Sequence, residues 1–166
     1  MPDVPVSSDL TEFLLDSESA TERLARAVSQ TLKPGDTLLL SGQIGAGKTF
    51  FARAMIQHRL AELGRYEDVP SPSFTLVQTY DLGGCEMWHV DLYRLSNIGE
   101  LDDLGLEDAF DEAICVVEWP DRLGPLRPVS SVELTFTVTG ETSRSVAIHF
   151  PADAARWADL RSVLVR

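Results

Sequence analysis

The chain has 166 residues, 44 % of them hydrophobic, which is enough for one domain with a hydrophobic core of its own. Its 14 basic and 26 acidic residues give a formal net charge of −12. This charge argues against direct, stable binding of nucleic acid, because phosphate backbones are held by concentrated basic surfaces. No apolar run approaches the roughly eighteen residues of a membrane span. The first thirty residues lack an export signal, so we expect a cytoplasmic protein without membrane contact.

The first predicted element is a helix near the N-terminus. Residues 1–16 are polar with scattered apolar positions, and we expect residues 1–15 to be poorly ordered. The segment Ser19-Ala20-Thr21-Glu22 then forms a capping box, in which two side chains satisfy backbone N–H groups at a helix start. The apolar residues that follow share one helical face and predict packing on the rest of the domain: Leu24, Val28 and Leu32.

Residues 42–49 match in full the P-loop pattern of Gly, four residues, Gly-Lys, and Ser or Thr. The motif requires a strand before it and a helix behind it. The apolar run Thr37–Ser41, which follows a break at Lys33-Pro34-Gly35, predicts that strand. Apolar residues at helical spacing predict the helix: Phe51, Ala52, Met55, Ile56, Leu60 and Leu63.

The residue types of this motif suit a bound triphosphate. Gly42, Gly45 and Gly47 would let the backbone curl so that its N–H groups face the phosphates. The ammonium of Lys48 would lie against the β- and γ-phosphates, and the hydroxyl of Thr49 would hold a magnesium ion at the positive end of the following helix. The alternative is a glycine-rich turn with an incidental lysine.

Two prolines in residues 69–75 exclude a helix and hold Ser73 and Thr75 in a loop. These hydroxyls would either sense a γ-phosphate, as nucleotide switches do, or belong to a rigid turn. Residues 74–80 and 85–91 then predict a hairpin, in which His89 and Asp91 share a face. Asp91 ends its strand and would orient a water molecule or cap a turn. His89 alone is more typical of a structural residue.

The acidic stretch 98–112 predicts one or two short helices. Residues 113–118 differ, because a continuous apolar run ending in Glu118 is typical of a strand covered on both faces. P-loop proteins place an acid at such a strand end to hold magnesium, directly or through water. The alternative is a strand-end carboxylate that faces solvent.

The remaining chain predicts a loop at residues 123–130, a hairpin of residues 131–139 and 144–150, and a closing helix at residues 152–165. Together these elements predict a single domain over residues 1–166. Its class is α/β, a P-loop NTPase-like three-layer fold with a mainly parallel central sheet, helices on both faces and added antiparallel hairpins.

Four motifs in this order closely resemble the bacterial TsaE family, and the resemblance spans about residues 15–150. The motifs are Gly45-Ala46-Gly47-Lys48-Thr49, residues 71–77 (Ser-Pro-Ser-Phe-Thr-Leu-Val), residues 89–95 (His-Val-Asp-Leu-Tyr-Arg-Leu) and Val117-Glu118-Trp119-Pro120. TsaE proteins are the ATPase component of the machinery that installs threonylcarbamoyladenosine in tRNA. The last two motifs are far more specific than a P-loop alone.

The resemblance implies ATP hydrolysis with ATP and Mg²⁺ as ligands, magnesium at Thr49 and Glu118, and roles in turnover for Lys48, Asp91 and Glu118. It also implies that Glu18, Thr21 and Arg144 lie near the base and sugar. The full set expected to contact the nucleotide is Gly42, Gly45, Ala46, Gly47, Lys48, Thr49, Phe50, Glu18, Thr21 and Arg144. Two positions depart from the family pattern, which usually has an acid where Gln43 stands and often Thr where Ser73 stands.

We therefore expect an ATPase that drives or resets a tRNA-modifying complex. Its partners would be ATP or ADP, the transferase and the transferase's paralogous scaffold subunit, with tRNA contacted only through those partners. One alternative is a small-molecule kinase, which would need an arginine-rich lid, and only Arg122 and Arg127 lie in a suitable loop. The other is a nucleotide-gated adaptor without significant hydrolysis.

Overall fold

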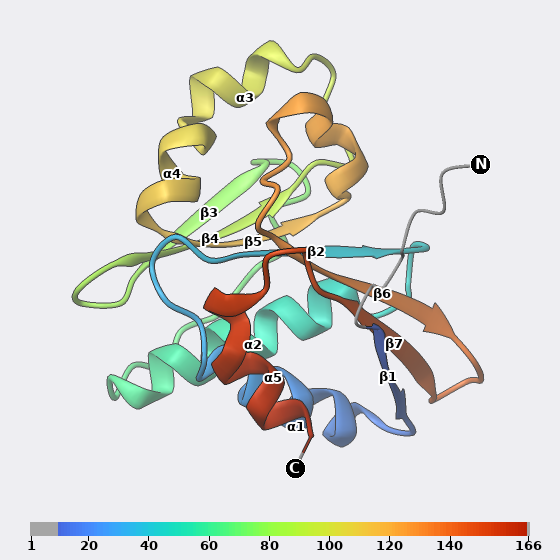
Figure 1. The fold of residues 1–166 in the computed structure, drawn as a ribbon. Helices are drawn as coiled ribbons and strands as arrows, with labels where there is room; N and C mark the ends of the chain where they lie inside the picture. The colour runs from blue at the N-terminus through green and yellow to red at the C-terminus, as the bar shows by residue number, and fades with distance from the viewer. Residues whose placement is uncertain (1–9, 166) are drawn as a thin grey trace.

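The computed structural model describes residues 10–165, and within them seven strands form one sheet in the order β1-β7-β6-β2-β5-β4-β3 (Figure 1). The expectation that residues 1–15 are poorly ordered therefore lies, for residues 1–9, outside the described part. The strands are β1 Leu10–Leu15, β2 Thr37–Gly42, β3 Val77–Asp81, β4 Glu86–Asp91, β5 Ile114–Glu118, β6 Val132–Val138 and β7 Arg144–His149. The helices are α1 Glu18–Ser29, α2 Lys48–Glu62, α3 Gly99–Leu104, α4 Leu106–Glu112 and α5 Ala158–Leu164, with 3₁₀ turns η1 Pro120–Leu126 and η2 Ala155–Trp157.

The middle of the sheet is parallel and its edges are antiparallel. Strands β6, β2, β5 and β4 run side by side in one direction, while β3 pairs antiparallel with β4 and β7 pairs antiparallel with both β6 and β1. In the parallel register, Glu118 of β5 lies opposite Leu40 of β2 and Asp91 of β4. The predicted α/β class, with a parallel centre and added hairpins, is confirmed.

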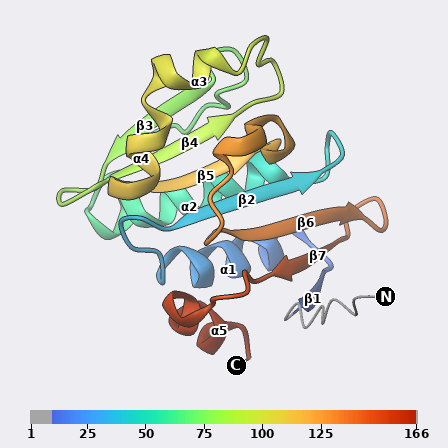
Figure 2. The same ribbon diagram turned by 45° about the horizontal axis from the view of Figure 1, so that its top comes forward.

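Helices cover both faces of this sheet (Figures 1 and 2). Helices α1, α2 and α5 lie on one face, and α3, α4 and η1 lie on the other. Successive side chains of β2 point to opposite faces of the sheet. Leu38 and Leu40 pack in the core with α1 and α2, and Leu39 packs in the core with α3. Among the helices of residues 10–165, none is long and apolar enough to cross a membrane.

The N-terminal segment differs from the sequence prediction. Residues 10–15 form strand β1, which pairs along its whole length with β7. Helix α1 also begins two residues earlier than predicted, because the hydroxyl of Ser17 accepts the backbone N–H of Ala20 at 3.1 Å and caps the helix. An edge strand is held by backbone hydrogen bonds to one neighbour and can form with only weak alternation of apolar and polar residues. The sequence pattern of residues 10–15 therefore did not indicate a strand.

Three other element boundaries differ from those predicted from the sequence. Strand β3 begins at Val77 rather than at residue 74, because Leu76 adopts a φ of 68° and its N–H closes a turn onto Pro72. The predicted loop 123–130 begins instead with the 3₁₀ turn η1. The closing helix is shorter than predicted, because η2 precedes it and Trp157 is fixed by a hydrogen bond to the Ser130 carbonyl.

The packing of Phe51 against Phe136 joins helix α2 to strand β6. Their ring centroids are 5.3 Å apart, and Phe51 is fully buried. We predict that Phe51→Ala lowers the free energy of unfolding by about 3–5 kcal/mol, since it removes a large core side chain. Tyr66→Ala is the control, because Tyr66 is 86 % exposed and its loss should change stability by less than about 0.5 kcal/mol. Urea unfolding of the three proteins measures this, and equal losses in both variants would contradict the packing described.

Candidate nucleotide-binding site

The predicted P-loop connects strand β2 to helix α2, and its glycines are needed for two different reasons. Gly45 and Gly47 have φ angles of 80° and 104°, with open space where a Cβ would stand, so the backbone conformation itself selects glycine there. Gly42 has a φ of 141°, and a Cβ on it would stand 2.5 Å from the carbonyl oxygen of Phe136. Strand β6 thus fixes the start of the loop, and helix α2 begins at its end.

Lys48 is folded back on its own loop. Its Nζ donates hydrogen bonds to the carbonyl oxygens of Gly42 and, at 3.4 Å, Gln43. It also lies 3.5 Å from the centre of the Trp119 ring, and only 4 % of the residue is exposed. Burial lowers the pKa of Lys48, while the nearby carboxylates, Glu118 first, act in the opposite direction. The ammonium is therefore held by neutral groups that an anion could replace.

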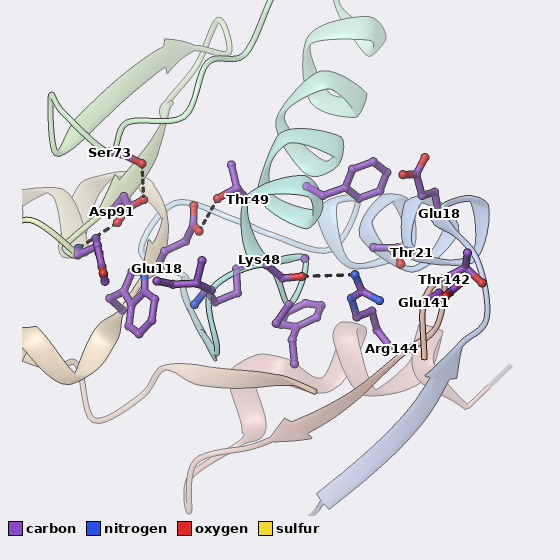
Figure 3. A pocket seen from close by; sticks show the side chains of 18 of the residues that line it. Glu18, Thr21, Lys48, Thr49, Ser73, Asp91, Glu118, Glu141, Thr142 and Arg144 are labelled. Carbon is purple, nitrogen blue, oxygen red and sulfur yellow. Dashed lines mark hydrogen bonds between the residues drawn. The ribbon is translucent and has the colours of Figure 1, made fainter. Parts of the chain in front are cut away.

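Glu118 ends strand β5 beside the loop, and both of its oxygens are occupied. Oε1 accepts the hydroxyl of Thr49 at 2.7 Å (Figure 3). Oε2 lies 2.7 Å from Nε2 of His89. Glu118 is 1 % exposed, so its carboxylate depends on these two partners. The predicted alternative, a strand-end acid facing solvent, is wrong.

Asp91 ends the neighbouring strand β4 and is held in a similar way. One carboxylate oxygen accepts the hydroxyl of Ser73 at 3.2 Å, and the other accepts the backbone N–H of Tyr93 at 3.0 Å (Figure 3). The predicted turn-capping contact is therefore present. The side chain also lines a cavity, so both of the roles considered for it remain compatible with its position.

A cavity of about 880 Å³ extends from these carboxylates across the P-loop. At its far end lie Glu18, Thr21 and Arg144, and Nη2 of Arg144 donates to the Gly45 carbonyl at 3.4 Å (Figure 3). Of the predicted site residues, those that line the cavity are Glu18, Thr21, Gly45, Ala46, Gly47, Lys48, Thr49, Phe50, Asp91, Glu118 and Arg144. Gly42 is not among the described residues that line the cavity, and its carbonyl accepts from Lys48. Thr75 is not among them either, and its hydroxyl accepts the side-chain amide of Gln78.

The position of the cavity follows from the direction of the strands. Parallel strands end at one edge of the sheet, and ligands of open α/β folds bind beyond that edge. Strands β2, β5 and β4 bring residues 42, 118 and 91 there. Strand β1 runs in the same direction, since it is antiparallel to β7 and β7 is antiparallel to β6. Glu18 therefore arrives at the same edge.

The model of the family described as "Threonylcarbamoyl adenosine biosynthesis protein TsaE" matches residues 15–146. The chain belongs to the TsaE family. Proteins named tRNA threonylcarbamoyladenosine biosynthesis protein TsaE are similar to it: that of Rickettsia felis is 37 % identical over 136 residues, 82 % of this chain and 78 % of its own. That of Bacillus subtilis is 32 % identical, over 76 % and 77 % of the two chains. That of Aquifex aeolicus is 33 % identical, over 84 % and 96 %.

The crystal structure of YdiB from Bacillus subtilis superposes on this TsaE-family chain with a TM-score of 0.74. The match covers 93 % of each chain at 24 % sequence identity, so it supports the P-loop NTPase-like α/β fold. The family assignment confirms the resemblance predicted from the four sequence motifs. It places the chain among proteins of threonylcarbamoyladenosine biosynthesis in tRNA.

Several residues that line or border the cavity were not expected from the sequence to lie there. Trp119 was quoted only as part of a family motif and given no role, yet its ring covers Lys48 and lies 5.0 Å from that of Tyr93. Its backbone is left-handed, with a φ of 60°, which no sequence pattern indicated. Glu141 and Thr142, in the turn between β6 and β7, also line the cavity, and only their place in a hairpin turn could have suggested this.

Thr49 and Glu118 offer oxygen atoms of the kind that Mg²⁺ prefers, and these atoms lie 2.7 Å apart. Within residues 10–165 no group of three or more His, Cys, Asp or Glu side chains could hold a metal by itself. This donor set is compatible with an ion that takes its other ligands from phosphate and water, as magnesium does in P-loop sites.

We predict that Gly42→Ala destabilises the protein more than Gly83→Ala. Both changes place a Cβ at a positive φ, which costs about 1–2 kcal/mol. Only the Cβ at Gly42 would meet a backbone oxygen, which should add about 1–3 kcal/mol, while the space around Gly83 is open. Denaturant unfolding measures the difference. Equal losses would show that the approach of β6 does not constrain the loop.

Proposed function

We propose that this TsaE-family chain is a magnesium-dependent ATPase that drives or resets the transferase of tRNA threonylcarbamoylation. The observation that carries the proposal is the hydrogen bond between Thr49 and the buried Glu118 beside a complete P-loop. It joins the hydroxyl that follows the P-loop lysine to the acid at the end of a neighbouring parallel strand. P-loop NTPases use this pair of groups to hold magnesium against the β- and γ-phosphates.

In the proposed mechanism the loop and helix α2 bind the triphosphate. Backbone N–H groups of residues 45–49 would face the phosphates, and the helix N-terminus would add its positive potential. Lys48 would exchange its present carbonyl and ring contacts for phosphate oxygens. The anionic phosphates would favour its charged form and offset the effect of burial on its pKa. Bound magnesium, held by Thr49 and Glu118, would neutralise charge on the phosphate oxygens.

Asp91 is the residue we propose for orienting the attacking water. Hydrolysis forms a bond from the water oxygen to the γ-phosphorus as the bond to the bridging oxygen breaks, giving ADP and phosphate. A carboxylate that accepts a hydrogen bond from that water fixes its direction of attack. Ser73 and the Tyr93 N–H hold Asp91 in one orientation, and 4 % of the residue is exposed, so its carboxylate is preorganised for this role.

The far end of the cavity supports the proposed contacts with base and sugar. Glu18, Thr21 and Phe50 come from the starts of α1 and α2, and Arg144 comes from the start of β7. A carboxylate and a hydroxyl are acceptors for the donors of a nucleoside. The aromatic ring of Phe50 offers an apolar surface for a base.

We propose that the tRNA is contacted by partner proteins, the transferase and its paralogous scaffold subunit. The net charge of −12 makes this chain a poor ligand for a phosphate backbone. The kinase alternative receives less support, because Arg122 donates to the Leu95 carbonyl and Arg127 pairs with Glu133. Neither is among the described residues that line the cavity.

We predict that ATP hydrolysis rises when the chain is mixed with the transferase and scaffold proteins, and that Asp91→Ala removes this rise. Loss of a group that acts on the nucleophile should lower turnover by about 100-fold with little change in nucleotide affinity. Phosphate release measures turnover, and equilibrium binding of ADP measures affinity. Asp121→Ala is the control, because Asp121 is also near Lys48 but is not among the described cavity-lining residues.

Two results would contradict the proposal. Stimulation by a small metabolite, with a phosphorylated product, would identify a kinase. Nucleotide binding without phosphate release, in every mixture with the partners, would identify an adaptor.

A further inference from the structure

His89 is buried beside the site without lining the cavity. It is 0 % exposed, and it is not among the described residues that line the cavity. Its Nε2 lies 2.7 Å from Oε2 of Glu118. The proposed mechanism gives His89 no contact with the nucleotide, so the burial of a polar ring at this position needs a separate explanation.

The hydrogen bonds of Glu118 determine which group donates in its contact with His89. A carboxylate can only accept, so the Nε2–H of His89 donates to Oε2 while the Thr49 hydroxyl donates to Oε1. The other ring nitrogen, Nδ1, has no hydrogen-bond partner in the part of the chain that the structure describes. The contact with Glu118 is therefore the one polar interaction of the ring among the described residues.

The ring reaches Glu118 from a rigid element. His89 lies two residues before Asp91 on strand β4, in the parallel part of the sheet, and its backbone is in register with Val116 of β5. Its side chain shares a sheet face with both carboxylates and reaches forward to the end of β5. The last torsion of a glutamate is broad and is fixed only by its contacts. His89 supplies the contact that holds Oε2, which leaves Oε1 facing Thr49.

We propose that His89 is a positioning residue that sets the magnesium affinity of the site by holding the Glu118 carboxylate. The inference rests on the proposed function, because it requires Thr49 and Glu118 to be magnesium ligands. Groups that orient a metal ligand commonly change metal affinity or activity by about 10- to 100-fold when they are removed.

The test measures binding of ADP carrying a ribose fluorophore as a function of MgCl₂ concentration. His89→Leu fills the site with an apolar side chain of similar size and removes the donor, so the magnesium concentration at half-maximal binding should rise by about tenfold or more. His89→Gln places an amide donor at the same number of bonds from the backbone as Nε2, and it should restore most of the parent's affinity for magnesium. Binding in EDTA should be the same for all three proteins.

Two controls separate positioning from general damage. His58→Leu removes another histidine beside a carboxylate, because His58 lies 2.7 Å from Glu62, but neither residue is among the described cavity-lining residues. It should not shift the magnesium dependence. In a Glu118→Gln background, His89→Leu should cause no further shift, because the group through which His89 acts has already been changed.

The inference is overturned if His89→Leu leaves the magnesium dependence unchanged, if the Leu and Gln variants shift it equally, or if binding in EDTA weakens by the same factor. Thermal unfolding without ligand reports whether each variant folds. If the Leu variant does not fold, His89→Asn replaces it, because its shorter amide cannot reach Oε2 and should also shift the dependence. Magnesium-independent binding by the parent would overturn the proposed function and this inference together; failure of the His89 variants alone would overturn only the inference.

Discussion

The hydrogen-bonded carboxylate of Glu118 is the interaction on which the rest of the site depends. Removing a carboxylate from water is costly unless its oxygens are paired. Thr49 from helix α2 and His89 from strand β4 supply the two partners, so one buried group links β5, β4 and the P-loop helix. The parallel register of β4 and β5 then places Asp91 directly beside it. Three elements that are distant in sequence are thus aligned at one sheet edge.

The antiparallel strands at one edge of the sheet complete the cavity. Strand β1 delivers the start of α1, and the turn between β6 and β7 delivers Glu141, Thr142 and then Arg144. The parallel centre supplies the end of the cavity that holds Lys48, Thr49 and Glu118, and the added strands supply the end that holds Glu18 and Arg144. In the proposed function the first end would contact the phosphates and the second the base and sugar.

The parts that sequence could predict are those in which local chemistry decides the structure. The glycines and Lys48 of the P-loop, and the apolar run before Glu118, have local signatures that do not depend on the rest of the fold. Strand β1 was missed because an edge strand is held by its neighbour rather than by its own pattern. The contacts of His89 and Trp119 could not be predicted, because each joins residues that are distant in sequence, His89 with Glu118 and Trp119 with Lys48. No local sequence pattern predicts either contact.

A crystal structure of the protein with magnesium and a non-hydrolysable ATP analogue would test the proposed site most directly. We expect triphosphate within the loop of residues 42–49 and magnesium bound to the Thr49 hydroxyl with Glu118 beside it. We also expect Lys48 to turn from the Gly42 carbonyl and Trp119 to the phosphates, and the base and sugar to lie at the end of the cavity that holds Glu18 and Arg144. A nucleotide bound elsewhere, or a metal bound without Thr49 and Glu118, would contradict the proposed site.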